Sequence, residues 1–175
     1  MKRLLLLRHA KAVTNGTGGD HGRALAPRGR NAAHLVGRAM RAEGYIPDLV
    51  LVSGATRTKE TWALVAPELK AEPKSEITDA LYLAPWNAIL KRAREVPDRI
   101  ETLLVIGHNP GLQDCAGALL KPSAGGPENK RRATMAEKFS TGALAVLDCA
   151  IERWAELAPG TAALTDFLKP RDLTD

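Results

Sequence analysis

The sequence is poor in cysteine and in aromatic residues. Cys115 and Cys149 are its only two cysteines, and a pair at this separation makes neither a disulfide framework nor a metal knuckle. We therefore expect both to be reduced core residues. Aromatic residues make up 4% of the chain, and none is interleaved with a cationic cluster as a base-stacking surface would require.

Long hydrophobic runs are missing as well. No apolar run approaches the roughly 20 residues that a membrane helix needs. The charged start Met1-Lys2-Arg3 is followed by only four leucines, which is too short for a signal peptide, and no small-residue cleavage pattern follows. We expect a cytoplasmic protein with no membrane partner.

Metal-binding motifs are also lacking. The chain contains no His-Glu-x-x-His and no Cys-x-x-Cys pattern, which disfavours a metal site. We expect a protein that works without a metal or another cofactor. A monomer is compatible with the sequence, which does not determine the oligomeric state.

Positive charge is in excess. The chain has 25 Lys and Arg against 20 Asp and Glu, a net charge of +5, which favours anionic partners. The cations gather at residues 28–41 and 130–132. We interpret both groups as solvated helix faces and expect no nucleic-acid partner. Segment 121–138 could also meet an acidic partner, although a solvated linker is the favoured interpretation.

Apolar runs alternate with helical patterns along the chain. Strands are expected at residues 4–7, 49–52, 74–78, 101–106 and 142–149, and helices at 30–43, 56–66, 86–94 and 112–120. Segment 121–138 is expected to be a loop followed by a charged helical piece, and 151–157 to add an antiparallel strand. The alternation predicts one domain over residues 1–175, a three-layer α/β/α sandwich with a mostly parallel sheet.

Three of the expected strands end in distinctive polar residues: Arg8-His9, Ser53 to Arg57, and Gly107-His108. The carboxyl ends of parallel strands share one edge of the sheet, where α/β proteins bind ligands. Two histidines and two arginines should therefore converge there. Two guanidinium groups match phosphoryl oxygens, one histidine can accept the phosphoryl group covalently, and a second can stabilise the transferring oxygens.

These segments resemble the histidine phosphatase superfamily, whose fold is phosphoglycerate mutase-like. The matching motifs are Arg8-His9-Ala10, Asp20-x-x-Arg23-x-Leu25-x-x-x-Gly29, Ser53-x-x-x-Arg57-x-x-x-Thr61 and Gly107-His108-Asn109-Pro110-Gly111, in this order. Residues 139–147 and Pro170 resemble the C-terminal part of the small SixA-type phosphohistidine phosphatases. The resemblance covers nearly the whole chain and is strongest to that group.

The resemblance implies a role for each of four residues. His9 is expected to be the nucleophile that forms a phosphohistidine intermediate. Arg8 and Arg57 are expected to hold the phosphoryl oxygens, and His108 to complete the site.

The resemblance also suggests residues that bind substrate. Asn15 is either a phosphate contact or a turn residue, and Lys11 could add charge at the mouth of the site. Asn109 is a further candidate for substrate binding. Asp20 is expected to anchor the first loop, while Arg23 could anchor it or touch substrate. The other polar residues are expected to be structural: Ser53 and Thr61 at a helix start and in packing, His21 and His34 at the surface.

One feature of many family members is missing. They carry a glutamate after the third strand that protonates the leaving oxygen. In this chain, the only carboxylate in residues 77–85 is Asp79, which is a weak candidate for this role. In a phosphohistidine, the imidazole is a good leaving group once it is protonated. A phosphate monoester must expel an alkoxide, so its cleavage depends more on a proton donor. A phosphohistidine on a protein is therefore the favoured substrate. The alternatives are a small-molecule phosphomonoesterase and a non-catalytic phosphoprotein-binding module.

Overall fold

The computed structural model describes residues 1–123 and 125–174. The strands are β1 (Lys2–Arg8), β2 (Leu49–Ser53), β3 (Lys74–Thr78), β4 (Thr102–Gly107), β5 (Leu144–Cys149) and β6 (Ala162–Leu168). The α-helices are α1 (Pro27–Glu43), α2 (Thr56–Val65), α3 (Trp86–Arg94), α4 (Gly111–Leu119) and α5 (Pro127–Glu137). The charged helical piece expected after the loop is therefore present as α5.

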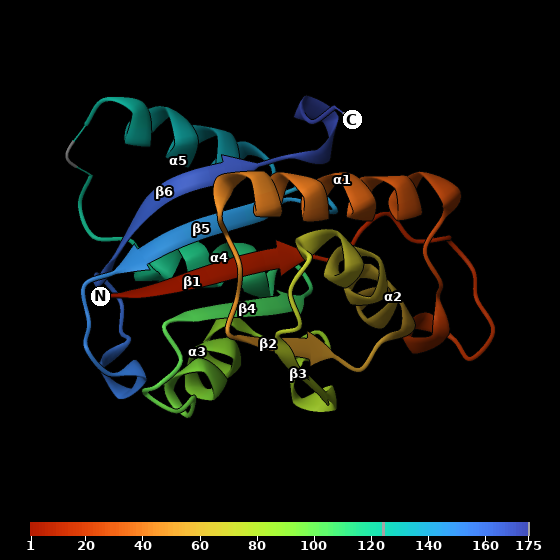
Figure 1. The fold of residues 1–175 in the computed structure, drawn as a ribbon, viewed down its shortest axis with the longest axis horizontal. Helices are drawn as coiled ribbons and strands as arrows, with labels where there is room; N and C mark the ends of the chain where they lie inside the picture. Colours follow the sequence, from red (N-terminus) through yellow and green to blue (C-terminus); the bar gives the residue numbers. More distant parts are fainter. Residues whose placement is uncertain (124, 175) are drawn as a thin grey trace.

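The strands form one sheet in the order β3-β2-β4-β1-β5-β6 (Figure 1). Strands β3, β2, β4 and β1 run parallel, whereas β5 pairs antiparallel with both β1 and β6. Helices α1 and α2 cover one face, and α3 and α4 cover the other. The expected α/β/α architecture with a mostly parallel sheet is confirmed.

Strand β1 lies inside the sheet and is buried on both faces. Leu4 and Leu6 pack into the cluster that includes α3 and α4, whereas Leu5 and Leu7 pack into the cluster under α1. Side chains alternate between the faces of a strand, so a continuous leucine run serves both layers. Each buried leucine contributes about 2 kcal/mol, which holds this strand and its last residues firmly in place.

The register of the parallel strands brings three strand ends together. Arg8 pairs with Gly107, and Val52 pairs with Ile106. His9, Ser53 and His108 therefore leave the sheet at one edge, as the strand pattern predicts.

The prediction of a strand at 151–157 is wrong. Ile151, Trp154 and Leu157 are buried at a spacing of three residues, which a strand would place on alternating faces. The segment instead contains a short 3₁₀ helix, Trp154–Glu156, and the Trp154 indole N–H donates to the carbonyl of Ile100 at 2.7 Å. The strand that pairs antiparallel with the outer side of β5 is β6, which begins only after this helix.

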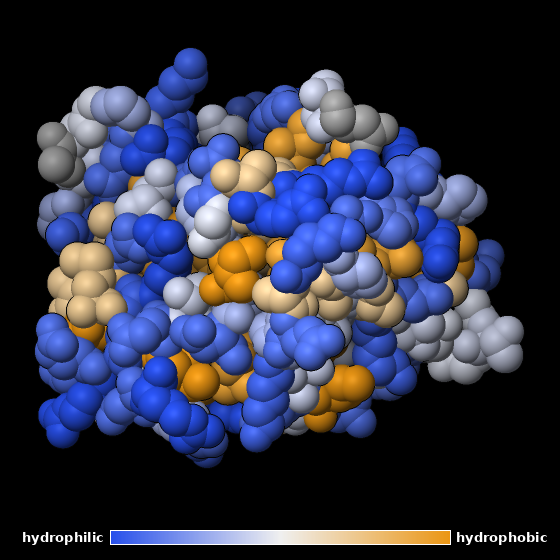
Figure 2. All heavy atoms as spheres, in the orientation of Figure 1, coloured by the Kyte–Doolittle hydropathy of each residue, from blue (hydrophilic) through white to orange (hydrophobic). Residues whose placement is uncertain are grey.

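Both cysteines are free and buried, as expected. No helix among the described residues combines the length and hydrophobicity that crossing a membrane requires. Figure 2 shows a largely hydrophilic face over α1 and α2, with hydrophobic residues in small separate groups.

Candidate active site

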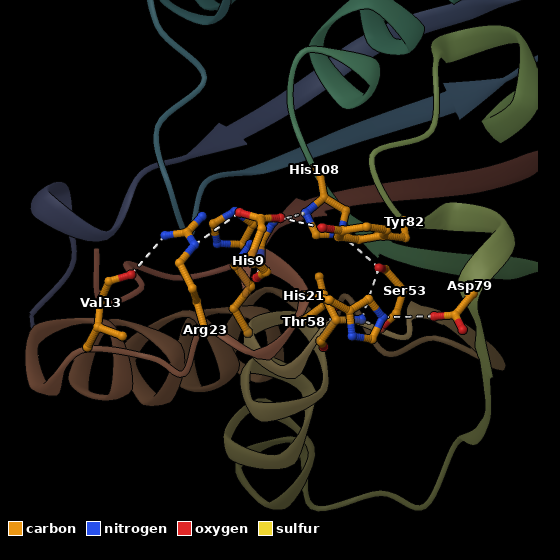
Figure 3. Close-up of polar contacts among 12 residues, drawn as sticks. His9, Val13, His21, Arg23, Ser53, Thr58, Asp79, Tyr82 and His108 are labelled. Carbon is orange, nitrogen blue, oxygen red and sulfur yellow. Dashed lines mark hydrogen bonds and ion pairs between the residues drawn. The ribbon is translucent and has the colours of Figure 1, made fainter. Parts of the chain in front are cut away.

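Arg8, His9, Arg57 and His108 meet at the carboxyl edge of the sheet. The ring centroids of His9 and His108 are 5.4 Å apart, and a terminal nitrogen of Arg57 lies 3.4 Å from His108 Nδ1. His9, Arg57 and His108 are buried polar residues. Figure 3 shows His9 and His108 directed toward one another from separate segments of the chain. The convergence that the strand pattern predicts is present.

His9 is held in the form that a nucleophile requires. Its Nδ1 lies 2.8 Å from the main-chain carbonyl of Ala10. A carbonyl only accepts hydrogen bonds, so Nδ1 carries the proton and Nε2 keeps its lone pair. Burial lowers the pKa of His9 to about 4, and the charges of Arg57 and Arg8 act in the same direction. At neutral pH the ring is therefore uncharged and nucleophilic.

His108 is positioned by a serine. Its Nε2 lies 2.7 Å from Ser53 Oγ, while its Nδ1 faces Arg57. Arg57 can only donate, so Nδ1 accepts and Nε2–H donates to Ser53. Burial, with the nearby His9 and Arg57, lowers the pKa of His108 to about 3. An anion placed at Nδ1 would reverse this balance and favour the protonated ring.

Arg8 and Arg57 each have a buried Nε–H without a hydrogen-bond partner. Among the described residues, these two Nε atoms are the only buried side-chain nitrogen or oxygen atoms that lack a hydrogen-bond partner. A terminal nitrogen of Arg8 donates to the carbonyl of Phe139 at 3.0 Å. Burial and the charge of Arg57 lower the pKa of Arg8. A buried guanidinium group and a half-buried one, each with a buried and unpaired Nε–H, form a site that an oxyanion would satisfy.

Asp20 anchors the loop between β1 and α1, as expected. Its carboxylate accepts hydrogen bonds from Arg57 and Arg23, each at 3.1 Å, and from the Tyr82 hydroxyl. The Tyr82 bond, followed by those of the arginines, holds the pKa of Asp20 far below its ordinary value. Arg23 also donates to the carbonyl of Val13 at 2.8 Å, so it helps to fix the loop.

The predicted substrate contacts lie around this core. Lys11 is exposed two residues beyond His9, and Asn15 is exposed in the same loop. Asn109 donates to the carbonyl of Phe139 at 3.1 Å and to Gln113. Its amide therefore supports the wall of the site. Contacts of Lys11, Asn15, Arg23 and Asn109 with substrate stay predictions.

The sequence analysis misses the contacts that Ser53 and Tyr82 make with His108. Ser53 is the last residue of β2, and its hydroxyl bonds to His108. The sequence analysis instead expects Ser53 to be a structural residue at a helix start. Tyr82 lies within the irregular segment after β3, with its ring edge-on to His108 at 5.5 Å. For Ser53 a signal does exist, because it ends a strand at the same edge as His108.

Asp79 lies apart from the histidine pair. Its side chain is 78% exposed and contacts His21 at 3.0 Å, to one side of the His9–His108 centre in Figure 3. No cluster of three or more metal-ligating side chains occurs within residues 1–123 and 125–174.

Comparisons with known proteins agree with this geometry. Residues 4–82 match the family model of the histidine phosphatase superfamily, branch 1. An uncharacterized protein from Mycobacterium tuberculosis is 37% identical over 165 residues, which cover 94% of this chain and 100% of that protein. A structure from Nakamurella multipartitia, named as a candidate phosphohistidine phosphatase SixA, is 31% identical, with a TM-score of 0.82 and coverage of 97% and 96%.

A more distant structure shares the fold. The protein histidine phosphatase SixA complexed with tungstate has a TM-score of 0.76 at 19% identity, with coverage of 97% of this chain and 98% of that chain. The motifs, the converged side chains and these similarities lead to one conclusion: the chain is a phosphatase that belongs to the histidine phosphatase superfamily, where it resembles the SixA proteins.

Proposed function

We propose that the protein removes the phosphoryl group from a phosphohistidine on another protein, through a covalent intermediate on His9 and without a metal ion. One observation carries the proposal. The two unpaired, buried Nε–H donors of Arg8 and Arg57 accompany a histidine whose Nε2 lone pair is free. Such a site can bind a phosphoryl group and offers it a nucleophile.

The first step transfers the phosphoryl group to the enzyme. Arg8 and Arg57 bind its oxygens and neutralise their charge. His9 Nε2 forms a bond to phosphorus while the P–N bond to the substrate histidine breaks, and that bond's electron pair leaves with the substrate imidazole. The anion raises the pKa of His108, so Nδ1 takes up a proton from solvent and then donates a hydrogen bond to a phosphoryl oxygen, while Nε2–H stays bonded to Ser53.

The second step releases phosphate. Water attacks phosphorus, the bond to His9 Nε2 breaks, and its electron pair returns to the imidazole. The proton of water passes to solvent or to the released phosphate. His9 regains its starting form because the Ala10 carbonyl has kept Nδ1 protonated throughout.

The surroundings favour a substrate whose leaving group already carries a proton. Hydrogen bonding keeps Asp20 ionised, and its carboxylate raises the pKa of Tyr82, so neither group readily releases a proton at neutral pH. A protonated phosphohistidine leaves as a neutral imidazole, whereas a phosphate monoester must expel an alkoxide. Transfer from a sugar phosphate should therefore be slow.

The test is chemical trapping. The protein is mixed with a phosphohistidine peptide, quenched in alkali, and analysed for phosphate on His9. We expect an acid-labile phosphoenzyme on His9, which His9→Ala lacks although it still binds vanadate. Chelators should leave turnover unchanged. Normal turnover by His9→Ala would overturn covalent catalysis there, and a higher kcat/KM on sugar phosphates would favour a small-molecule phosphomonoesterase. Binding without any turnover would indicate a phosphoprotein-binding module.

A further inference from the structure

A second hollow lies beside the active site, between α1 and the C-terminal segment. It encloses about 420 Å³. Its lining is rich in cations and short polar side chains: Lys11, Arg28, Lys138 and Arg171 with Asn31 and Thr141. The C-terminal 3₁₀ helix Pro170–Asp172 forms its outer wall and contacts α1. We call this hollow the cationic groove.

A thin wall separates the cationic groove from the catalytic residues. Lys11 lies two residues beyond His9. Thr141 is followed by Gly142, whose N–H donates to the carbonyl of His9 at 3.0 Å. On the same turn, the Phe139 carbonyl accepts from Arg8. Ser140 and Thr141 therefore line the groove on the same turn whose Phe139 and Gly142 main-chain groups support the active site.

The positive charge of the groove is largely uncompensated. In the described part of the chain, no ion pair joins Lys11, Arg28 or Lys138 to a carboxylate. Asp172 is shared between Lys169 at 3.7 Å and Arg171 at 3.8 Å. A smaller adjoining hollow shares Lys138 and Arg171 with the groove and adds Lys169 along with the carboxylate of Glu137. Cations therefore outnumber carboxylates along the whole length of the two hollows.

We propose that the cationic groove binds an acidic segment of the substrate protein that flanks its phosphohistidine; this inference rests on the proposed function. The cations come from four separate segments around the groove, so they match several carboxylates spaced along a chain better than one compact anion. Among the residues that the structure describes, no aromatic side chain lines the groove to stack a nucleobase. The neighbouring catalytic site would receive the phosphorylated residue of the same chain.

The exposure of these cations determines what the groove contributes. Lys11, Arg28, Lys138 and Arg171 are exposed. Exposed charge pairs are individually weak, and they act mainly by steering a complementary partner and by discriminating against others. The groove should therefore select substrates by charge while leaving the phosphoryl chemistry unchanged.

The first experiment measures binding without turnover. A labelled, unphosphorylated peptide rich in Asp and Glu, and its Asn and Gln counterpart, are titrated with the protein at low salt. The groove variant is Arg28→Glu with Lys138→Glu and Arg171→Glu. The control, Lys74→Glu with Lys91→Glu and Arg99→Glu, changes the net charge equally at exposed positions outside the groove. Circular dichroism confirms that both fold.

We expect the acidic peptide to bind the wild type and the control more tightly than its amide counterpart. The groove variant should bind the acidic peptide roughly tenfold more weakly than the control does, and added salt should remove the difference. Equal binding of both peptides by the wild type, or equal loss in the two variants, would overturn the proposal.

A kinetic arm separates this proposal from the proposed function. A phosphohistidine peptide with acidic flanks and one with amide flanks are compared as substrates. The groove variant should lose the lower KM for the acidic flanks and keep the wild-type kcat/KM for the amide flanks. If the wild type binds the acidic peptide through the groove but hydrolyses neither phosphopeptide, the proposed function fails while the groove's preference stands.

Discussion

Arg57 donates one hydrogen bond to the main-chain carbonyl of Asp20 at 2.7 Å and a second to its carboxylate at 3.1 Å. The first of these bonds orients the guanidinium and survives any change of the Asp20 side chain. The second places a negative charge beside the proposed phosphoryl site. Asp20 therefore orients Arg57, and its carboxylate should oppose the binding of an anion at the proposed phosphoryl site.

Replacing Asp20 with Asn separates these two effects. Asp20→Asn keeps the main-chain contact and an amide oxygen for Arg57, but it removes the repulsion between the carboxylate and phosphate. We expect inorganic phosphate to inhibit the variant at a roughly three- to tenfold lower concentration. Product-inhibition constants at constant ionic strength measure this. Unchanged or weaker inhibition would show that the carboxylate does not act on the bound anion.

Arg57→Lys tests the guanidinium itself. Lysine keeps the charge but has no Nε–H and cannot form a bidentate contact. We expect kcat/KM for a phosphohistidine peptide to fall about 100-fold. Arg3→Lys is the matched control, because Arg3 forms an ion pair with Asp148 on the sheet outside the site. Similar losses in both variants would mean that the change acts through stability.

Much of the fold follows from local patterns in the sequence. The leucine run of β1 and the apolar run of β4 are readable because buried parallel strands need hydrocarbon on both faces. The tail is different. Its burial depends on Trp154, which packs against distant parts of the chain and bonds to Ile100. A contact of that kind leaves no periodicity in the sequence.

The centre of the active site is predictable for a related reason. His9, His108 and Arg57 follow strands closely, so the order of the strands places them. Tyr82 is not predictable in this way, because it lies in an irregular segment whose course depends on the packed structure. The carbonyl of Phe139 cannot be inferred either, since every residue has one and only the folded turn directs this one at Arg8.

Ser53→Ala tests the support of His108. The substitution leaves the Nε2–H of a buried imidazole without its acceptor and frees the ring to turn. We expect kcat to fall about tenfold, with little change in KM, because the lost hydrogen bond positions His108, which we propose acts on the transferring phosphoryl group. Thr165→Ala removes a hydroxyl that bonds to the Val146 carbonyl on the sheet and should keep normal kcat. An equal loss in both would remove Ser53 from the mechanism.

The buried histidines make the stability of the fold depend on pH. His9 titrates near 6.5 in an unfolded chain and at about 4 in the folded protein. Between these values the unfolded chain binds the proton more readily, so stability falls as the pH drops from about 6.5 to 4. For His9 the loss is on the order of 3 kcal/mol.

Urea unfolding at several pH values measures this effect. The wild type should lose more free energy of unfolding between pH 6.5 and 4 than His9→Asn, because the variant has no titrating group at that position. His108 contributes with the same sign in both proteins. Parallel curves for the two proteins would show that His9 has an ordinary pKa in the folded state.

Substitutions of Tyr82 test whether its aromatic ring packs against the imidazole that leaves the phosphoryl group. Its ring lies edge-on to His108 at 5.5 Å and to His21 at 4.8 Å, and its hydroxyl donates to Asp20. Tyr82→Phe keeps the ring and loses the hydroxyl, whereas Tyr82→Ala loses both. If the ring packs against the departing imidazole, kcat/KM for phosphohistidine should fall about tenfold in Tyr82→Ala and much less in Tyr82→Phe. Cleavage of a small aliphatic phosphate ester, which presents no ring, should be far less affected. Equal losses in the two variants would assign the effect to the hydroxyl and its hold on Asp20 instead.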